Sequence, residues 1–291
     1  MMPFVVYANI KFKAMKTLLV ATDFSKNSIH VLEYAIMFAN RMDAAIHLIW
    51  VDNSSLEESL VDTIEEGLRI EKKNYLEKVV ANHKSQVPGG KLEYHLKKGK
   101  VYQEIGKTAR QLKADIVFAG THGVTGFEQY WIGSNAYRIM TSAPCPVITV
   151  RGDYNFEGGI TNILLPMDSS LETKQKLPFT VELAERFGAT IHLLKVYNSP
   201  IGVIRKRIDG FGREAEKCLK DKNINYMLES VEATNVAASI LEYSEKSSID
   251  LIAIMTEQNI TTANKFLGPY AQQLINGANV PVLSLRDREY N

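Results

Sequence analysis

An internal repeat constrains the fold of this chain more than any other feature of its sequence. Residues 16–53 match residues 161–198 at a constant offset of 145 residues: KTLLVATDFS aligns with TNILLPMDSS, and AAIHLIWVDN aligns with ATIHLLKVYN. The later blocks DIVFAG and APCPVITV recur as DLIAIM and ANVPVLSL at an offset of 135, so the second copy is ten residues shorter. Copies of about 140 residues are too large for solenoid units, and each has the size of a domain.

The length of 291 residues fits two such domains after a short extension. Residues 1–14, MMPFVVYANIKFKA, place their lysines after the apolar stretch, whereas a secretory signal places basic residues before it. The polar, glycine-containing stretch RGDYNFEGG at 151–159 suits a linker. We therefore expect an N-terminal extension (1–14), a first domain (15–152) and a second domain (153–291).

Charge and cysteine content exclude several classes of protein. With 34 basic and 33 acidic residues, the net charge of +1 gives no bulk attraction to nucleic acid or to an acidic membrane. Two cysteines are too few for a disulfide framework and fit a reducing compartment. No apolar run approaches the roughly 18–20 residues that span a bilayer. We expect a cytoplasmic protein that binds neither nucleic acid nor membrane.

Within the first repeat, short apolar runs alternate with segments of helical periodicity. The runs predict strands at 17–22, 45–51, 92–97, 115–119 and 146–150, and the periodic segments predict helices between them, including 56–82, 101–112 and 132–141. Such alternation predicts an α/β fold in each repeat: a doubly wound, five-stranded parallel sheet of Rossmann-like type, covered on both faces. Ligands of such sheets bind outside the carboxyl ends of the strands, where the strand order reverses.

A glycine-rich loop follows the fourth predicted strand. It reads Gly120-Thr121-His122-Gly123, and after nine residues Gly133-Ser134 begin the last predicted helix. Glycines let the backbone turn tightly and approach a ligand, and a helix N-terminus presents free N–H groups to an anion. The loop therefore suits a polyphosphate. A tight turn followed by an ordinary helix cap is the alternative interpretation.

These residues resemble the universal stress protein family. Gly120, Gly123, Gly133 and Ser134 match the family's nucleotide-binding pattern Gly-x2-Gly-x9-Gly-Ser/Thr without a gap, and Asp23 matches an aspartate near the end of the first strand. The closing Ala-Pro-Cys-Pro-Val is also typical of the family. The resemblance covers 16–150 and, more weakly, 162–286. It also implies that the two domains pair through their last strands within one chain, and it leaves a further homodimer open.

The resemblance implies an ATP pocket in the first domain, with Mg2+ as its companion ion. The residues expected to line the adenosine are Ala21, Thr22, Asp23, Trp50 and Val51. Those expected around the phosphates, or where the chain passes close to them, are Gly99, Gly120, His122, Gly123, Gly133, Ser134 and Asn135. Asp23 suits a ribose or base contact, since a carboxylate repels phosphate unless a metal ion lies between them. Trp50 is larger than the usual residue and either stacks on the base or crowds it.

The second domain departs from this pattern. Met255 replaces Gly120, Gln258 replaces Gly123, and Pro269 replaces Ser134 and removes an N–H donor. Lys195 replaces Trp50 and Thr234 replaces Gly99, whereas Gly268, Asp168 and Ser170 persist. We expect this domain to have lost phosphate binding and to serve pairing or regulation.

Three functions remain open on the sequence. The first is an ATP-binding regulatory protein of the stress response, which acts through an unknown protein partner. The second is an ATPase. Its turnover should be slow, because the glycine loop contains no lysine or arginine to stabilise developing charge on the phosphates. The third is a scaffold that binds no nucleotide. We assign no catalytic residue and no metal ligand: the motifs GxSxG, HExxH and CxxC are absent from the sequence, and His47 and His192, at matching strand positions, are interpreted as structural.

Overall fold

The computed structural model describes residues 15–53, 62–121, 132–256 and 268–286. Most of residues 15–148 form one compact unit, and residues 149–286 belong to a second. The expected domain boundary at 152/153 falls a few residues later and stays a prediction. His122 and Gly123 of the glycine loop, Gln258 and residues 1–14 lie outside the described residues.

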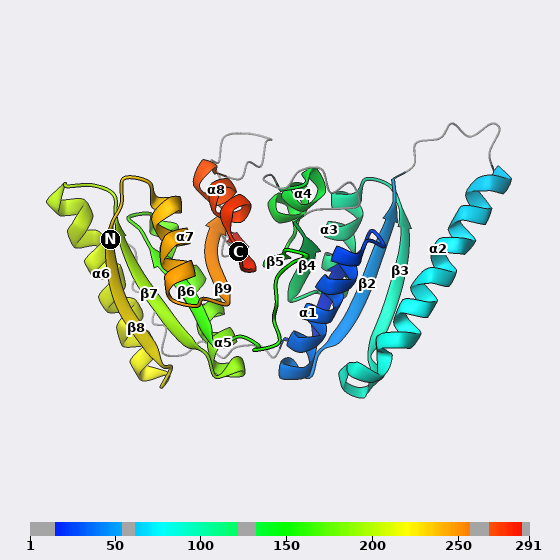
Figure 1. Cartoon of the computed structure of the whole chain (residues 1–291), viewed down its shortest axis with the longest axis horizontal. Helices are drawn as coiled ribbons and strands as arrows, with labels where there is room; N and C mark the ends of the chain where they lie inside the picture. Colours follow the sequence, from blue (N-terminus) through cyan, green and yellow to red (C-terminus); the bar gives the residue numbers. More distant parts are fainter. Residues whose placement is uncertain (1–14, 54–61, 122–131, 257–267, 287–291) are drawn as a thin grey trace. The chain divides into compact units, whose positions relative to one another are not determined.

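The first repeat has the strand order β3-β2-β1-β4-β5, with parallel pairing of β1 to β2 and β4 and of β2 to β3 (Figure 1). The helix Val101–Leu112 agrees with its predicted limits, and the described part of the second helix begins at Asp62. The elements are β1 (Thr17–Ala21), α1 (Lys26–Met42), β2 (Ala45–Asp52), α2 (Asp62–His83), β3 (Leu92–Lys98), α3 (Val101–Leu112), β4 (Ile116–Gly120), α4 (Ser134–Ser142) and β5 (Val147–Val150), with the short 3-10 turns η2 (Lys84–Gln86) and η3 (Pro88–Gly90) before β3.

The second repeat has the equivalent strand order β8-β7-β6-β9-β10, again with parallel pairing. Its first helix is shorter than α1 and follows a 3-10 turn. The elements are β6 (Asn162–Met167), η4 (Leu171–Lys174), α5 (Lys176–Phe187), β7 (Thr190–Tyr197), α6 (Gly202–Asp221), β8 (Tyr226–Glu232), α7 (Val236–Lys246), β9 (Leu251–Thr256), α8 (Pro269–Gly277) and β10 (Val282–Arg286).

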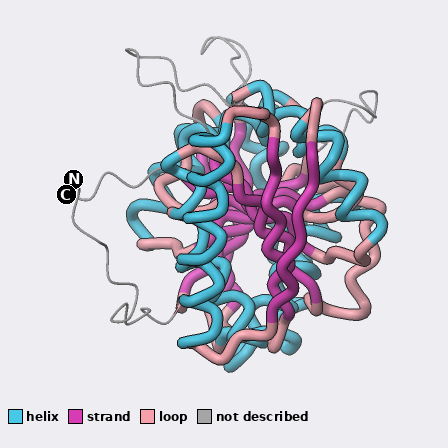
Figure 2. Tube along the Cα trace, turned by 90° about the vertical axis from the view of Figure 1, so that its left-hand side faces the viewer, coloured by secondary structure: helices cyan, strands magenta, loops and turns pink. Residues whose placement is uncertain are grey.

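The order of the strands places helices on both faces of each sheet. From β1 the chain winds outward through α1 and α2 to β3, and then crosses back through α3 and α4 to β4 and β5. Because such crossovers are right-handed, the outward and the returning helices cover opposite faces. The magenta strands accordingly lie between cyan helices in Figure 2. The α/β, doubly wound fold is therefore confirmed for both repeats, while the pairing of their last strands stays a prediction.

The central strands are apolar throughout because both faces are covered. Leu18, Leu19 and Val20 of β1 are each 0% exposed, as are Ile163, Leu164 and Leu165 at the equivalent strand β6. Each sheet reverses its strand order beside this strand, between β1 and β4 and between β6 and β9. The carboxyl ends of these strands are where a ligand of such a sheet binds. Among the described residues, no helix is both long and apolar enough to cross a membrane.

Candidate functional site

A hydrogen-bonded turn follows β1 at the carboxyl edge of the first sheet. One carboxylate oxygen of Asp23 accepts hydrogen bonds from the backbone N–H of Ser25 (3.0 Å) and from its hydroxyl (2.6 Å). The Ser25 hydroxyl in turn accepts from the N–H of Ser28 and caps α1, as its sequence position indicates. Thr22 is buried, and its hydroxyl lies 3.0 Å from that of Ser28. These contacts fix the backbone directly beside the point where the strand order of the sheet reverses.

The second repeat builds the same turn from Asp168 and Ser170. The Asp168 carboxylate accepts from the Ser170 N–H at 2.8 Å and from its hydroxyl at 2.6 Å. The helix start differs, because Ser170 makes no side-chain cap and the 3-10 turn η4 intervenes before α5. The identical Asp/Ser pairs thus preserve the strand-end turn, whereas the helix that follows has changed.

Aromatic side chains gather at the end of β2. The ring of Trp50 stacks on that of Phe24, with centroids 5.3 Å apart and planes 29° apart. Phe24 also meets Tyr75 of α2 edge-on at 4.8 Å, and the Lys72 ammonium lies 5.4 Å from the Phe24 ring. Phe24 adopts a φ of 67°, which is unusual for a non-glycine residue. Trp50 is therefore half-buried within an aromatic cluster, beside the buried Val51 and the half-buried Ala21.

The glycine loop begins at β4 and ends at α4, and the structure brings these two ends together. The Gly133 N–H donates to the Thr121 carbonyl at 2.8 Å, and a Cβ on Gly133 would lie only 3.3 Å from the same oxygen. Gly120, at the end of β4, is half-buried, whereas Ser134 and Asn135 are exposed on the first turn of α4. No side chain caps this helix end among the described residues. The first turn of α4 therefore presents backbone N–H groups next to the end of β4.

Gly99 adjoins this edge after β3. Its N–H donates to the Asp52 carbonyl at 2.8 Å, which continues the ladder between β2 and β3 by one step. Its φ of 141° is one that residues with a side chain rarely adopt, and a Cβ there would lie 3.3 Å from Cγ of Glu104. The backbone conformation at position 99 therefore requires glycine. We expected this residue where the chain passes close to the phosphates, and its φ gives a conformational reason for glycine there.

A cavity of about 500 Å³, open to solvent, lies at the corresponding edge of the second repeat. Its lining combines polar and apolar surface and includes the N-terminal residues of α7 and α8. Asn235 caps α7 by accepting from the Ala238 N–H, and Pro269 lacks an N–H at the start of α8. Named from β6 onward, the lining includes Asp168, Ser170, Asn198, Thr234, Asn235, Pro269 and Gln273. The second repeat therefore retains room for a small molecule even though its glycine pattern is lost.

Two lysines distinguish this second edge from the first. Lys195, at the position of Trp50, forms an ion pair with Asp209 of α6 at 3.0 Å, and the Tyr197 hydroxyl donates to the same carboxylate oxygen. Lys176, at the start of α5, is 3% exposed. Burial lowers the pKa of Lys176 to about 8, and attraction to Asp168 opposes this shift. The aromatic cluster of the first repeat is thus replaced by paired charges.

The family model for the universal stress protein family matches residues 15–151 and again residues 159–286. The chain belongs to this family.

A universal stress protein of Methanocaldococcus jannaschii is 32% identical over 141 residues, a match that covers 47% of this chain and 82% of that protein. A putative universal stress protein of Staphylococcus aureus is 26% identical over 140 residues, covering 47% of this chain and 84% of that protein. Among solved structures, a universal stress protein from Archaeoglobus fulgidus superposes with a TM-score of 0.74 at 17% identity, covering 95% of this chain and 98% of the other. A putative universal stress protein from Pseudomonas aeruginosa gives 0.63 at 15% identity, with 94% of each chain covered. The structural matches show that the tandem fold is shared.

The structure brings four of the residues expected to line the pocket to one edge of the first sheet: Thr22, Asp23, Gly120 and Gly133. Trp50 and Val51 lie at the end of the neighbouring strand. Sequence reasoning missed Phe24 as the partner of Trp50, and Tyr75 as a partner of Phe24. Phe24 directly follows the aspartate of the motif, and this adjacency was the available signal. The cavity of the second repeat was missed as well.

Proposed function

We propose that the first repeat binds ATP, with Mg2+, at the carboxyl edge of its sheet, and that occupancy of this site regulates the protein in a stress response. The contact between the Gly133 N–H and the Thr121 carbonyl carries the proposal. It holds the end of β4 against the uncapped first turn of α4. Phosphate oxygens at this point would accept hydrogen bonds from the backbone N–H groups of Ser134 and Asn135, favoured by the helix dipole.

The remaining expected residues have definite roles in this proposal. We assign adenine to the ring of Trp50 at the end of β2. Asp23 has one carboxylate oxygen engaged by Ser25, and we assign its other oxygen to a ribose or base contact. His122 and Gly123 complete the phosphate loop. Mg2+ is held mainly by phosphate oxygens and water in such sites, and we assign no side chain to it.

Binding rather than turnover is the proposed activity. Hydrolysis of ATP needs a group that orients water and a cation that stabilises charge on the phosphates. The sequence from Gly120 to Ser134 contains neither lysine nor arginine, and its one acid is Glu128. A regulatory role instead requires that ATP bind two conformations with different affinity. Pairing of the repeats through their last strands, a homodimer, a protein partner and a cytoplasmic location are parts of the same proposal.

The nucleotide content of the freshly purified full chain tests the proposal, followed by titration calorimetry with Mg-ATP. We expect one ATP per chain. Gly133→Val should abolish binding, because its side chain would press on the Thr121 carbonyl and cover the N–H groups. Gly268→Val, at the equivalent cap of α8, is the matched control and should bind normally. Circular dichroism verifies that both variants fold.

Four results would contradict parts of this proposal. Equal binding by wild type and Gly133→Val would remove the phosphate site from the first repeat. Loss of binding in Gly268→Val alone would place the nucleotide in the second repeat. A turnover number above about 1 s⁻¹ would make the protein an enzyme. Absence of nucleotide, with no uptake of Mg-ATP, would favour the scaffold.

The cavity of the second repeat favours a second candidate function, the binding of a small polar metabolite. Asp168, Thr234 and Asn235 provide carboxylate, hydroxyl and amide groups around about 500 Å³. Native mass spectrometry of the Gly133→Val chain tests it, since any retained small molecule must then lie elsewhere than in the proposed ATP site.

A further inference from the structure

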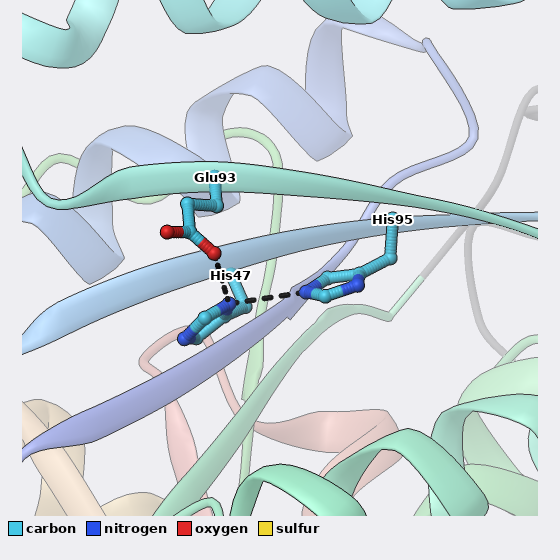
Figure 3. Close-up of side chains that lie close together, drawn as sticks. All are labelled: His47, Glu93 and His95. Atoms are coloured by element: carbon cyan, nitrogen blue, oxygen red, sulfur yellow. Dashed lines mark hydrogen bonds and ion pairs between the residues drawn. The ribbon is translucent and has the colours of Figure 1, made fainter.

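Three potential metal ligands meet on neighbouring strands of the first repeat, away from the edge described above. His47 lies on β2, and Glu93 and His95 lie on β3 (Figure 3). The register pairs His47 with Glu93 and Ile49 with His95. Because side chains two residues apart on a strand share a face, both β3 residues project on the same side as His47. This set of residues is called the His–Glu–His cluster below.

The donor atoms of the cluster are as close as ligands around one ion. His47 Nδ1 lies 3.0 Å from His95 Nε2 and 3.6 Å from Glu93 Oε2, and all three donors lie within 4.8 Å of one another. Metal–ligand bonds of about 2.0–2.2 Å place tetrahedral donors roughly 3.3 Å apart. Between the two rings, a proton on one nitrogen makes the present hydrogen bond. An ion that binds both nitrogens takes the place of that proton, so only small movements of the side chains are required.

The charges around the cluster suit a cation. Burial lowers the pKa of His47 and that of His95, and the Glu93 carboxylate lies beside both rings. His47 and Lys97 lower the pKa of His95 further, whereas Glu93 acts in the opposite direction on both rings. The Glu93 carboxylate therefore supplies the negative charge that offsets the nearby Lys97 when a divalent ion is bound.

The second repeat shows what the same position looks like when it is purely structural. Its histidine, His192, uses both ring nitrogens: Nδ1 lies 3.0 Å from the Tyr243 hydroxyl and Nε2 lies 3.2 Å from the Asn162 amide oxygen. The register places Met227 and Glu229 where the first repeat has Glu93 and His95. The second repeat therefore supplies hydrogen-bond partners for its histidine in place of a second imidazole.

In the first repeat, the position of Tyr243 is occupied by Thr108 of α3, whose buried hydroxyl has no hydrogen-bond partner among the described residues. His47 therefore interacts with the side chains of Glu93 and His95 on β3. The fold of the repeat alone does not require this arrangement, because the second repeat forms the same strands without it.

The cluster is accessible to an ion and separate from the proposed ATP site. The Glu93 side chain is 72% exposed, the His47 side chain is 14% exposed, and β3 is the outermost strand of its sheet. Trp50 contacts Phe24, which packs on Tyr75 of α2, so even-numbered positions of β2 face the α2 side. His47 therefore faces the opposite side, and it precedes the carboxyl end of β2.

We propose that His47, Glu93 and His95 bind one divalent first-row transition-metal ion, with Zn2+ as the best match. Two imidazoles and one carboxylate are a common zinc donor set, and the open fourth position takes water from the exposed side. The bound ion takes the place of the His47–His95 hydrogen bond and joins the outermost strand β3 to β2.

Titration of the full chain with Co2+ tests the proposal, after treatment with EDTA and without nucleotide. We expect one Co2+ per chain with visible d–d absorption, displaced by Zn2+. His95→Gln and His47→Gln should each weaken binding by at least about 100-fold, since even the loss of an indirect partner of a metal ligand costs 10–100-fold. The matched control is His30→Gln, because the His30 ring also lies near a carboxylate, Glu33, at 3.8 Å. Gly133→Val should also bind Co2+ normally.

Imidazole 15N chemical shifts of the wild-type chain give a second readout that does not depend on a variant folding. Addition of Zn2+ should shift the nitrogens of His47 and His95 and leave those of His192 unchanged. Absence of saturable Co2+ binding, unchanged affinity in both His→Gln variants, or shifts confined to other histidines would each overturn the proposal.

Discussion

The ring of Trp50 stacks on that of Phe24 with the two centroids 5.3 Å apart. Trp50, which is proposed to contact adenine, therefore packs on Phe24, and Phe24 itself packs on Tyr75 of α2. Offset aromatic pairs contribute about 0.5–1.5 kcal/mol beyond the area they bury. The stack therefore holds the Trp50 ring in one orientation before any ligand arrives.

The fluorescence of Trp50 should report ATP binding. The chain has two tryptophans, so the measurement uses a Trp131→Phe background in which only Trp50 emits. Stacking of adenine on the indole should quench its emission, with saturation at the stoichiometry found by calorimetry. Gly133→Val in the same background should show no change. ATP binding detected by calorimetry without any change in emission would mean that adenine does not approach Trp50.

Glycine should be better tolerated than alanine at position 24. Phe24 has a φ of 67°, a left-handed conformation that costs a residue with a Cβ roughly 1–2 kcal/mol. Both Phe24→Gly and Phe24→Ala remove the aromatic contacts, so their difference isolates the backbone term. We expect Phe24→Gly to be more stable than Phe24→Ala by about 1 kcal/mol in urea denaturation.

Ser169, the counterpart of Phe24, is the control for this comparison, because it does not have a positive φ. There the order should reverse, with Ser169→Ala more stable than Ser169→Gly. The same order at both sites would mean that the φ of Phe24 is not the source of the difference.

Removal of the Ser25 hydroxyl should destabilise the chain more than removal of the Ser170 hydroxyl. Ser25 accepts from the Ser28 N–H and caps α1, whereas Ser170 makes no side-chain cap. Both hydroxyls donate to an aspartate at 2.6 Å, so that contribution is common to the two variants. Loss of an N-cap costs about 1 kcal/mol. Thermal unfolding of Ser25→Ala and Ser170→Ala, measured side by side, checks the difference; equal losses would contradict it.

Lys176 should make the stability of the chain depend on pH above neutrality. Its pKa is about 8 in the folded chain, against an ordinary value of 10.5. Between these values the unfolded state binds more protons than the folded state, so the free energy of unfolding rises with pH. Below about pH 8 the full penalty of the buried charge applies, on the order of 3 kcal/mol.

Lys176→Met should remove this dependence and stabilise the protein at pH 7. A hydrophobic residue is tolerated at the matching place in the first repeat, where Val31 is 0% exposed. Denaturant unfolding of both chains between pH 7 and 9.5 provides the measurement, with Lys174→Met, a half-buried neighbour, as the control variant. Parallel pH profiles for wild type and Lys176→Met would rule out the burial of a charged lysine.

Much of the fold follows from the sequence because apolar strands and amphipathic helices alternate regularly. Helix Val101–Leu112 agrees with its expected limits, and β4 is shifted by one residue toward the C-terminus relative to the expected strand. The turns at Asp23 and Asp168, where the Asp and Ser residues are identical in the two repeats, form the same two hydrogen bonds. Local hydrogen bonding within a few residues is what sequence comparison captures well.

The contacts that sequence reasoning missed depend on distant elements. Phe24 meets Tyr75 only because α2 returns along β3, and no local pattern specifies that approach. The cavity beside Asp168 is not predicted by the sequence, because the loss of the glycines and of the Pro269 N–H bears only on phosphate binding. The space between strands and helices depends on how their side chains pack. A count of backbone hydrogen-bond donors does not reveal that packing.

The outermost position of β3 has a consequence for association between molecules. An outer strand offers unpaired backbone groups that another sheet can extend, and natural proteins discourage this with charged side chains. Strand β3 ends with Lys97 and Lys98, and the exposed Glu93 lies near its beginning. A second copy in parallel register would bring like charges together along the new ladder. The charged side chains of β3 therefore discourage edge-to-edge aggregation of the first repeat at this strand.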